Sequence, residues 1–195
     1  MGILSQDYYD RETSRVAKDL LGKKLVRLQK GRALSGMIVE TEAYLSRSDS
    51  ASHAYKGQTP RSSVMFGPAG RAYVYFIYGM HYMFNVVTEE KGSPGAVLVR
   101  AVEPLNGLHQ MQARRKKTGR DLTNGPAKLC QAMAIDKFLN GWDLTRGKTL
   151  WLEEYEAIPD TRVFRGPRIG IDYAEPRDRQ ANLRFLVDKD VNSNP

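Results

Sequence analysis

The chain of 195 residues is poor in the side chains that build disulfides and zinc sites, with one cysteine and three histidines. The single cysteine, Cys130, excludes a disulfide within the chain, and so few thiol and imidazole groups argue against a Cys/His zinc site. No apolar run approaches membrane-spanning length, and no charged segment followed by an apolar one opens the sequence. These absences predict a cytosolic protein without metal, cofactor or membrane partner.

Several common catalytic motifs are also missing. The sequence has no phosphate-binding loop of the Gly-x-x-x-x-Gly-Lys type, no dinucleotide fingerprint and no Gly-x-Ser-x-Gly nucleophile elbow. Positive charge is abundant, because 30 Lys and Arg against 22 Asp and Glu give a formal charge of +8 and a pI near 9.6. A basic surface attracts polyanions such as nucleic acid, although many small basic domains bind nothing more than bulk anions.

The segment 37–45 carries the strongest local pattern. Its alternation predicts a β-strand with a mostly apolar face for the core and a second face that carries two carboxylates and a tyrosine. The core face comprises Met37, Val39, Thr41, Ala43 and Leu45, and the second face comprises Ile38, Glu40, Glu42 and Tyr44.

Two acids on one side of a buried strand are costly unless the protein uses them. Glu40 and Glu42 are expected about 6–7 Å apart, close enough for one to be ionised while the other is driven towards a different protonation state. Such a pair can supply a base for catalysis. The alternative is a sheet edge on which both acids are solvated.

The remaining elements predict a single mixed α/β (α+β) domain, residues 1–195, built around a largely antiparallel sheet with a protruding β-hairpin. The segment 46–70 is a long polar loop, and such loops in compact domains are usually functional or disordered. A polar tail begins at about residue 188. We expect helices at 11–21 (capped by Asp10 and stopped at Gly22), 107–117 and 124–135 (capped by Asn124), strands at 23–28, 96–102 (closed by Pro104), 162–171 and 182–187, and a turn at 31–35.

The hairpin is predicted from two β-rich runs, 71–78 and 82–88, joined through Gly79. On an ideal strand Tyr73 and Tyr75 face one way, while Tyr78 ends the strand at the tip. An aromatic side chain at a hairpin tip can enter a stack of bases as a wedge, whereas one in mid-strand can only stack on a base brought to it. Tyrosine is also a favoured strand residue, so the pattern alone is compatible with ordinary packing.

Three further features allow both a functional and a structural interpretation. Asn85 lies in an apolar run, where a buried amide must find hydrogen-bond partners in the protein or in a ligand. His53 is either a ligand contact or an ordinary loop histidine. The basic run 114–117 could contact a phosphate backbone or form a solvated helix end.

Taken together, the ordered motifs of this chain resemble those of the alkyladenine (3-methyladenine) DNA glycosylase family, the type found in mammals and many bacteria. The resemblance extends from about residue 20 to residue 187. Its motifs are Val39-Glu40-Thr41-Glu42-Ala43-Tyr44, Ala51-Ser52-His53, Thr59-Pro60-Arg61, Met65-Phe66, Tyr73–Met80, Asn85-Val86, Val97–Pro104, Asn124–Ala132 and Gly166-Pro167-Arg168-Ile169-Gly170.

The resemblance implies a role for individual residues. Glu42 matches the general base of the family, and Arg100 matches an arginine near the attacking water and the DNA backbone. Tyr78 matches the intercalating wedge, with Met80 as the next candidate. The pocket for the extruded base is implied at Tyr44, His53 and Tyr75, with Asn85 as the amide that excludes guanine.

The activity implied is that of a monofunctional DNA glycosylase that flips alkylated or deaminated purines from duplex DNA and hydrolyses the N-glycosidic bond. The expected partner is double-stranded DNA, bound by a monomer in the cytoplasm with the nucleoid if the source is bacterial, or in the nucleus if it is eukaryotic. Two alternatives are a non-catalytic nucleic-acid-binding module and a glycoside hydrolase that uses Glu40 and Glu42 as its carboxylate pair.

Overall fold

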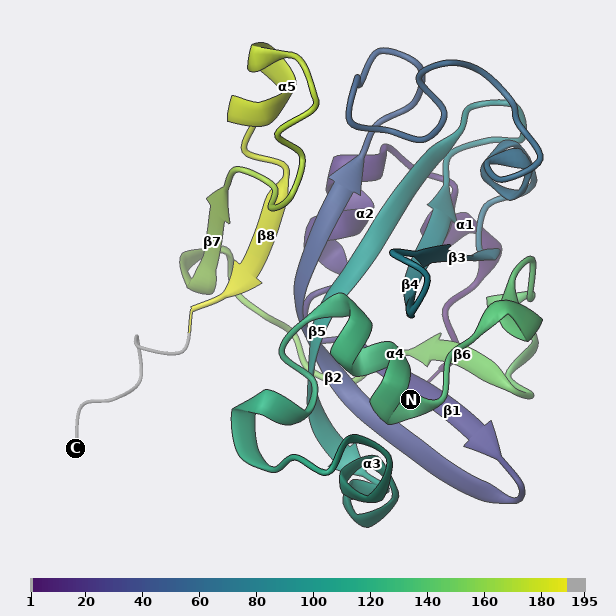
Figure 1. Ribbon diagram of the computed structural model, residues 1–195, viewed down its shortest axis with the longest axis vertical. Coiled ribbons are helices and arrows are strands. Elements are labelled where there is room, and N and C mark those ends of the chain that lie inside the picture. Colours follow the sequence, from purple (N-terminus) through teal and green to yellow (C-terminus); the bar gives the residue numbers. More distant parts are fainter. Residues whose placement is uncertain (1, 189–195) are drawn as a thin grey trace.

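The computed structural model describes residues 2–188, which form one antiparallel sheet with helices around it (Figure 1). The main strand order is β3-β4-β5-β2-β1-β6, and β8 pairs with both β2 and β7. All strand pairs described are antiparallel, so the fold class is confirmed. The strands are β1 (Lys24–Gln29), β2 (Arg32–Tyr44), β3 (Ala72–Ile77), β4 (His81–Thr88), β5 (Gly95–Asn106), β6 (Leu150–Glu153), β7 (Val163–Gly166) and β8 (Arg184–Val187).

The helices are short and pack on the faces of this sheet. Thr41 anchors one of them, because its buried hydroxyl donates to the Ala17 carbonyl of α2 at 2.7 Å. No described helix is long and apolar enough to cross a membrane. The α-helices are α1 (Gln6–Tyr9), α2 (Thr13–Asp19), α3 (Leu108–Arg115), α4 (Pro126–Met133) and α5 (Pro176–Gln180), and the 3-10 helices are η1 (Ser63–Phe66), η2 (Gly119–Leu122), η3 (Lys137–Leu139), η4 (Leu144–Arg146) and η5 (Asp160–Arg162).

The first long helix is shorter than predicted and has a different cap. It begins at Thr13, and the side chain of Glu12, not Asp10, accepts hydrogen bonds from the backbone N–H groups of Ser14 and Arg15. A glutamate can satisfy these orphan donors as a shorter cap residue does, and its charge suits the positive end of the helix.

Other boundaries moved for identifiable reasons. The predicted turn at 31–35 is wrong, since β2 already begins at Arg32. The strand β5 continues through Pro104, which lies at an irregularity of the β2–β5 ladder where a missing N–H is tolerated. The predicted Asn124 cap is also wrong, because α4 begins with Pro126 after Gly125, and Asn124 accepts from Lys128. The sequence did not predict β6 or α5, and β7 covers only part of the predicted strand 162–171. Each of these elements has only four or five residues, which is too few for a clear periodic pattern.

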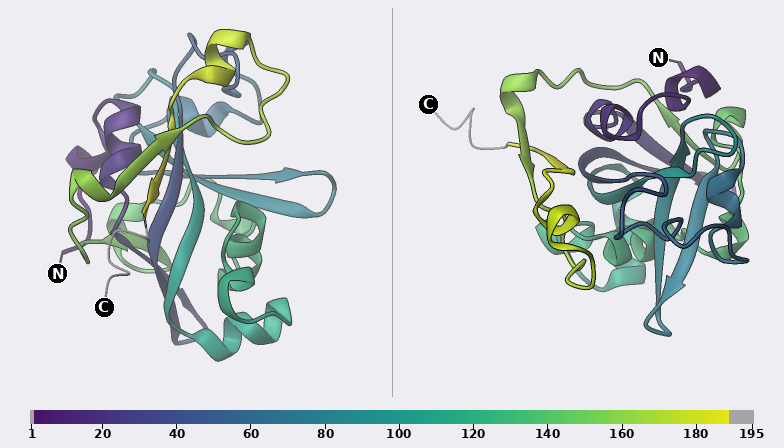
Figure 2. Two further views of the ribbon diagram at one scale, coloured as in Figure 1. Left: turned by 90° about the vertical axis from the view of Figure 1, so that its left-hand side faces the viewer. Right: turned by 90° about the horizontal axis from the view of Figure 1, so that it is seen from above.

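The predicted hairpin is present. β3 and β4 pair from Ala72 opposite Val86 to Ile77 opposite His81, which leaves Tyr78, Gly79 and Met80 as the connection. The hairpin projects from the face of the molecule seen in Figure 1, as the side view in Figure 2 shows.

The face assignment of β2 is only partly correct. Ile38 is fully buried in the core instead of sharing a face with Glu40. The cause is a pair of register irregularities in the β2–β5 ladder, which passes from Ile38 opposite Val102 to Glu40 opposite Ala101 and then to Thr41 opposite Val99. Bulges of this kind redirect side chains and are common beside active sites. Beyond the irregularity, Glu42 and Tyr44 lie on the same side of β2, as predicted, since the Tyr44 hydroxyl donates to the Glu42 carboxylate.

The predicted extent of the single domain, 1–195, stays a prediction. The polar tail predicted from about residue 188 lies outside the described residues after Asp188.

Candidate active site

A cavity of about 660 Å³ opens at the base of the hairpin. Its walls come from β2, β3, β4 and β5, from the long loop 46–70, and from the segment 169–173. Six of the eight predicted site residues line it, although they are spread over the sequence: Tyr44, His53, Tyr75, Tyr78, Asn85 and Arg100.

Glu42 is fully buried behind the wall of this cavity, and three donors hold its carboxylate. The Tyr44 hydroxyl donates to Oε2 at 2.9 Å, and the backbone N–H of Ile169 donates to Oε1 at 2.8 Å. Nη1 of Arg100 lies 3.2 Å from Oε2. A buried carboxylate needs such partners to remain ionised, and an ionised carboxylate is what a general base requires.

Glu40 does not share the cavity with Glu42. Its Oε1 accepts from Nε of Arg100 at 2.9 Å and from Nε of Arg184 at 2.7 Å, and it borders a second cavity. The two carboxylates therefore do not flank one open space, as a glycoside hydrolase requires of its acid pair.

The aromatic wall is built on Tyr75. The His53 ring touches it at 4.6 Å between centroids, at a steep angle of 71°, and Nδ1 of His53 lies 2.8 Å from the Tyr73 hydroxyl. Burial, reinforced by the positive charge of Arg61, lowers the pKa of His53 to about 4, so the ring is neutral at pH 7. Burial also raises the pKa of Tyr75, which stays protonated.

Asn85 is buried and lines the cavity on β4. Its Nδ2 donates to the backbone carbonyl of Tyr73 at 3.2 Å, directly across the hairpin ladder. That bond fixes the amide in place beside the aromatic wall, which is what the predicted role requires.

The hairpin tip carries the two predicted intercalating residues on its surface. Tyr78 is 80% exposed and Met80 is 68% exposed, an unusual state for large apolar side chains. Tyr78 also has a φ of +54°, in the left-handed region that non-glycine residues rarely adopt. The tip thus exposes an aromatic ring to solvent on a residue whose backbone conformation is energetically unfavourable for a non-glycine residue.

Two arginines of the site, Arg61 and Arg168, were not predicted from the sequence. The guanidinium of Arg61 lies 4.9 Å above the Tyr75 ring, and that of Arg168 lies 4.8 Å from the Tyr44 ring. Arg168 is also buried in a two-pronged ion pair with Asp49, which fixes the segment that bears the Ile169 N–H. Both arginines stand in motifs of the resemblance, but neither motif by itself showed which ring lies under the guanidinium.

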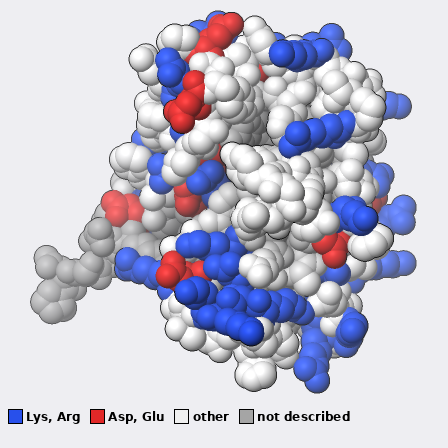
Figure 3. Space-filling view, in the orientation of Figure 1, with Lys and Arg blue, Asp and Glu red and all other residues white. Residues whose placement is uncertain are grey.

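Lys and Arg outnumber acidic residues on the face from which the hairpin projects, and they gather below its centre over the segment from α3 to α4 (Figure 3). Part of the run 114–117 is structural. Arg114 donates to the Ala132 carbonyl and to Gln29, and Arg115 donates to Gln131, so both hold α3 against its neighbours. Any phosphate contact by this run falls to the exposed Lys116 and Lys117.

Comparison with known proteins agrees with this geometry. The family described as methylpurine-DNA glycosylase matches residues 7–191. The chain belongs to this family. Similar relatives carry the name "Putative 3-methyladenine DNA glycosylase". They include proteins of Carboxydothermus hydrogenoformans (51% identity, 87% of this chain and 89% of that one), Methanocella arvoryzae (48%, 89% and 87%) and Clostridium perfringens strain 13 (44%, 94% and 95%).

Family membership confirms the predicted class of activity, a DNA glycosylase that hydrolyses N-glycosidic bonds in base excision repair. The site is made of carboxylate, aromatic, guanidinium and amide side chains. Within residues 2–188, no group of three or more His, Cys, Asp or Glu side chains is arranged to hold a metal ion.

Proposed function

We propose that this glycosylase removes damaged purines from double-stranded DNA by flipping the nucleotide into the cavity beside Glu42. One observation carries the proposal: a buried, triply held carboxylate stands behind an aromatic cavity at the base of a hairpin whose tip exposes Tyr78. The name shared by the relatives supports a damaged purine as the target.

The hairpin supports the flipping step. A base inside a duplex is out of reach of any side chain, so it must rotate out of the stack, and the space it leaves must be filled. Tyr78 is the filler and Met80 supports it from the same tip. A wedge costs unstacking energy, and wider contact of the basic face with the bent duplex offsets this cost.

The chemical step follows from the position of Glu42. Its carboxylate takes a proton from a water molecule while the water oxygen bonds to C1′ and the C1′–N bond breaks, so the base leaves with the bonding electrons. Arg100, which touches the same carboxylate, lies where it can orient that water and the adjoining phosphate. Purines methylated on a ring nitrogen are cationic and leave readily, and the aromatic wall at Tyr75 favours such cations.

Water is the proposed nucleophile, which makes the enzyme monofunctional. One lysine, Lys56, lies on the exposed rim of the cavity and is the only amine in the described lining. Reduction with borohydride during turnover should trap no enzyme–DNA adduct, and a trapped adduct lost in Lys56→Gln would assign the attack to that amine instead.

We further propose that the protein acts as a monomer in the cytoplasm, in association with the nucleoid. The bacterial and archaeal source of the relatives supports this location. The proposed base, wedge and pocket all come from one chain, which supports a monomer, because no second copy is needed to complete the site.

The direct test is single-turnover incubation with duplexes that carry hypoxanthine, ethenoadenine, 3-methyladenine or 7-methylguanine. Alkali then cuts the strand at abasic sites. Scission only after alkali supports a monofunctional glycosylase, and an intact strand in all four duplexes would leave only a binding role. Scission before alkali would show lyase activity. Release of sugar from oligosaccharides would favour the glycoside hydrolase alternative.

A further inference from the structure

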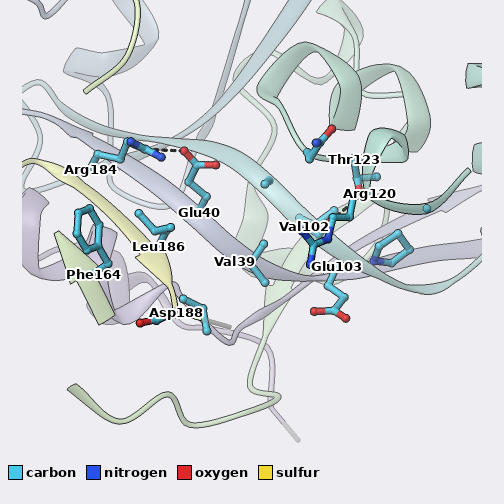
Figure 4. Close-up of a pocket in the computed structure, with 15 residues that line it drawn as sticks. Val39, Glu40, Val102, Glu103, Arg120, Thr123, Phe164, Arg184, Leu186 and Asp188 are labelled. Atoms are coloured by element: carbon cyan, nitrogen blue, oxygen red, sulfur yellow. Dashed lines mark hydrogen bonds and ion pairs between the residues drawn. The ribbon is translucent and has the colours of Figure 1, made fainter. Parts of the chain in front are cut away.

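A second cavity of about 630 Å³ lies between the β2–β5 ladder and the β7–β8 pair (Figure 4). The side chains of Glu40 and Arg184 approach each other at its edge, and the figure marks their bond. Its lining comes from β2, β5, β7, β8 and the segment 119–124. Glu40 and Arg184 on this side and Arg100 on the side of the active site form a charged wall between the two cavities.

That wall is a chain of alternating charges that leads inward to the proposed base. Arg184 bonds to Glu40 at 2.7 Å, Glu40 to Arg100 at 2.9 Å, and Arg100 to Glu42 at 3.2 Å. The side chains become more buried along this path, with exposed fractions of 23%, 19%, 12% and 0%. Two guanidinium and two carboxylate groups balance, so the chain needs no further counter-ion.

The fold brings these groups together from three strands. Glu42 and Arg184 are paired in the β2–β8 ladder, yet the Arg184 side chain bonds to Glu40, the next residue on that side of β2. Arg100 lies at the residue that the β2–β5 register omits, between Val99 and Ala101. An extra residue at a bulge can point its side chain away from the regular alternation, and here it reaches both carboxylates.

Both arginines use Nε to bind the same oxygen, Oε1 of Glu40. Glu40 therefore holds the Arg100 guanidinium at its Nε atom, and only Nη1 of that guanidinium contacts Glu42. Without Glu40, Glu42 would be the sole carboxylate partner of Arg100, and a carboxylate fully engaged by a guanidinium is a weaker proton acceptor.

We propose that Glu40 and Arg184 are positioning residues that fix Arg100 and limit its hold on Glu42. The inference rests on the proposed role of Glu42 as the base. Neither residue touches the proposed path of the substrate, because both border the other cavity.

The other groups around Glu42 keep the same charge when Glu40 or Arg184 is substituted. Arg168 is balanced by Asp49 in their buried pair. The backbone N–H of Ile169 carries no charge to lose. Burial raises the pKa of each neighbouring phenol, so these are neutral at working pH: Tyr44, Tyr75 and Tyr173.

The charge chain predicts opposite shifts for its two outer members. Glu40→Gln removes a negative charge near the proposed base, so the acidic limb of the pH–rate profile (the fall in rate at low pH) should move to lower pH. Arg184→Gln removes a positive charge, so the acidic limb should move to higher pH. A charge a few ångström away in a partly buried site shifts such a limb by about half to one pH unit. Glu40→Gln should also lower the plateau rate by roughly tenfold, since the proton acceptor is weaker.

The experiment measures single-turnover excision of hypoxanthine by saturating enzyme from about pH 4.5 to 8, the range in which a carboxylate base acts. The double variant Glu40→Gln/Arg184→Gln should return the limb to its wild-type position, because both charges are gone. Arg184→Lys keeps the charge and should leave the limb unmoved. Arg146→Gln, which breaks an exposed ion pair with Asp143 outside both cavities, is the control.

Affinity for lesion DNA should stay within a few-fold in each variant, so the effect lies in the rate and not in binding. Limbs that coincide, or that move in the same direction, would overturn the proposal and leave a structural ion pair. Arg184→Gln compared with Arg184→Lys, both checked by circular dichroism, still tests the direction of the shift if Glu40→Gln fails to fold. If Glu42→Gln excises normally in this assay, the assignment of the base has failed instead.

Discussion

The backbone N–H of Ile169 donates a hydrogen bond to Oε1 of Glu42 at 2.8 Å, across 127 positions of the chain. The bond ties the segment after β7 to the C-terminal end of β2 and fixes one carboxylate oxygen of Glu42. The other oxygen, Oε2, receives the Tyr44 hydroxyl and lies 3.2 Å from Nη1 of Arg100, so both oxygens of the proposed base are held in place.

Glu42→Gln should abolish excision and leave binding to lesion or abasic-site DNA within a few-fold. The amide keeps the shape and the Ile169 contact but cannot take a proton from water, a loss of about 10²–10⁴-fold in rate for a general base. Single-turnover excision and a gel-shift titration measure the two effects. Glu90→Gln, an exposed residue, is the control. Near-normal excision by Glu42→Gln would move the role to another group, with Glu40 tested next.

Tyr78→Ser should weaken flipping more than it changes the chemical step. Without the ring, the extruded nucleotide returns to the stack more readily, and stacking on an aromatic side chain is worth about 1–3 kcal/mol. The fluorescence of a flipped ethenoadenine reports this equilibrium directly. Met80→Ser changes the other exposed side chain of the tip and should have a smaller effect. A flipping equilibrium that only Met80→Ser alters would reverse the two roles.

Affinity for undamaged duplex should fall steeply with salt, because basic side chains replace counterions along the DNA backbone. The double variant Lys116→Gln/Lys117→Gln should reduce the slope of log K against log salt by about 1–2 if both lysines contact phosphates. Arg146→Gln, which removes one positive charge from another part of the surface, is the control. A binding constant that does not change between low and physiological salt would contradict binding to the duplex backbone.

The sequence revealed the parts of the site that lie within single segments. Gly79 between two β-rich runs predicted the hairpin, and alternation predicted that Tyr73 and Tyr75 share a face, as they do. It could not reveal the bulges that place Glu40 and Ile38 on different faces and that leave Arg100 without a partner in the β2–β5 register, because a register shift depends on the partner strand.

Contacts between distant segments were equally invisible in the sequence. Arg184 lies 144 positions from Glu40, and Arg168 lies 119 positions from Asp49. Nothing in the local pattern around either arginine indicates which carboxylate it meets. Burial of Asn85 was predicted from its apolar neighbours, but the Tyr73 carbonyl that holds it follows only from the hairpin register.

His53 should make the protein less stable as the pH falls. Burial and Arg61 hold its pKa at about 4 in the folded state, below the unfolded value of 6.5, so the unfolded chain binds the proton first. Stability should therefore decline from about pH 6.5 towards pH 4 and then level off for this group. His53→Gln removes the effect, so the difference in Tm between wild type and variant should narrow as the pH falls. His109→Gln, at an exposed histidine, should track the wild type, and a constant difference for His53→Gln would show that the ring titrates normally.

Asn85 provides the sharpest test of selectivity. Guanine differs from hypoxanthine by an exocyclic amine, and a side chain placed at that edge rejects it by a clash or by an unpaired donor. The Asn85 amide is fixed in the cavity by its bond to the Tyr73 carbonyl, so it cannot easily swing aside to admit the amine. Asn85→Gly should therefore raise the slow excision of normal guanine and change hypoxanthine excision less.

Both rates are measured on duplexes that are identical except for the target base. Asn85→Ala provides a second variant, because glycine weakens a strand by about 0.5–1 kcal/mol relative to alanine. Both variants remove the amide, so both should raise the guanine-to-hypoxanthine ratio while circular dichroism shows an intact fold. If the ratio stays at the wild-type value in both folded variants, Asn85 only holds the hairpin, and guanine is excluded by another part of the cavity wall.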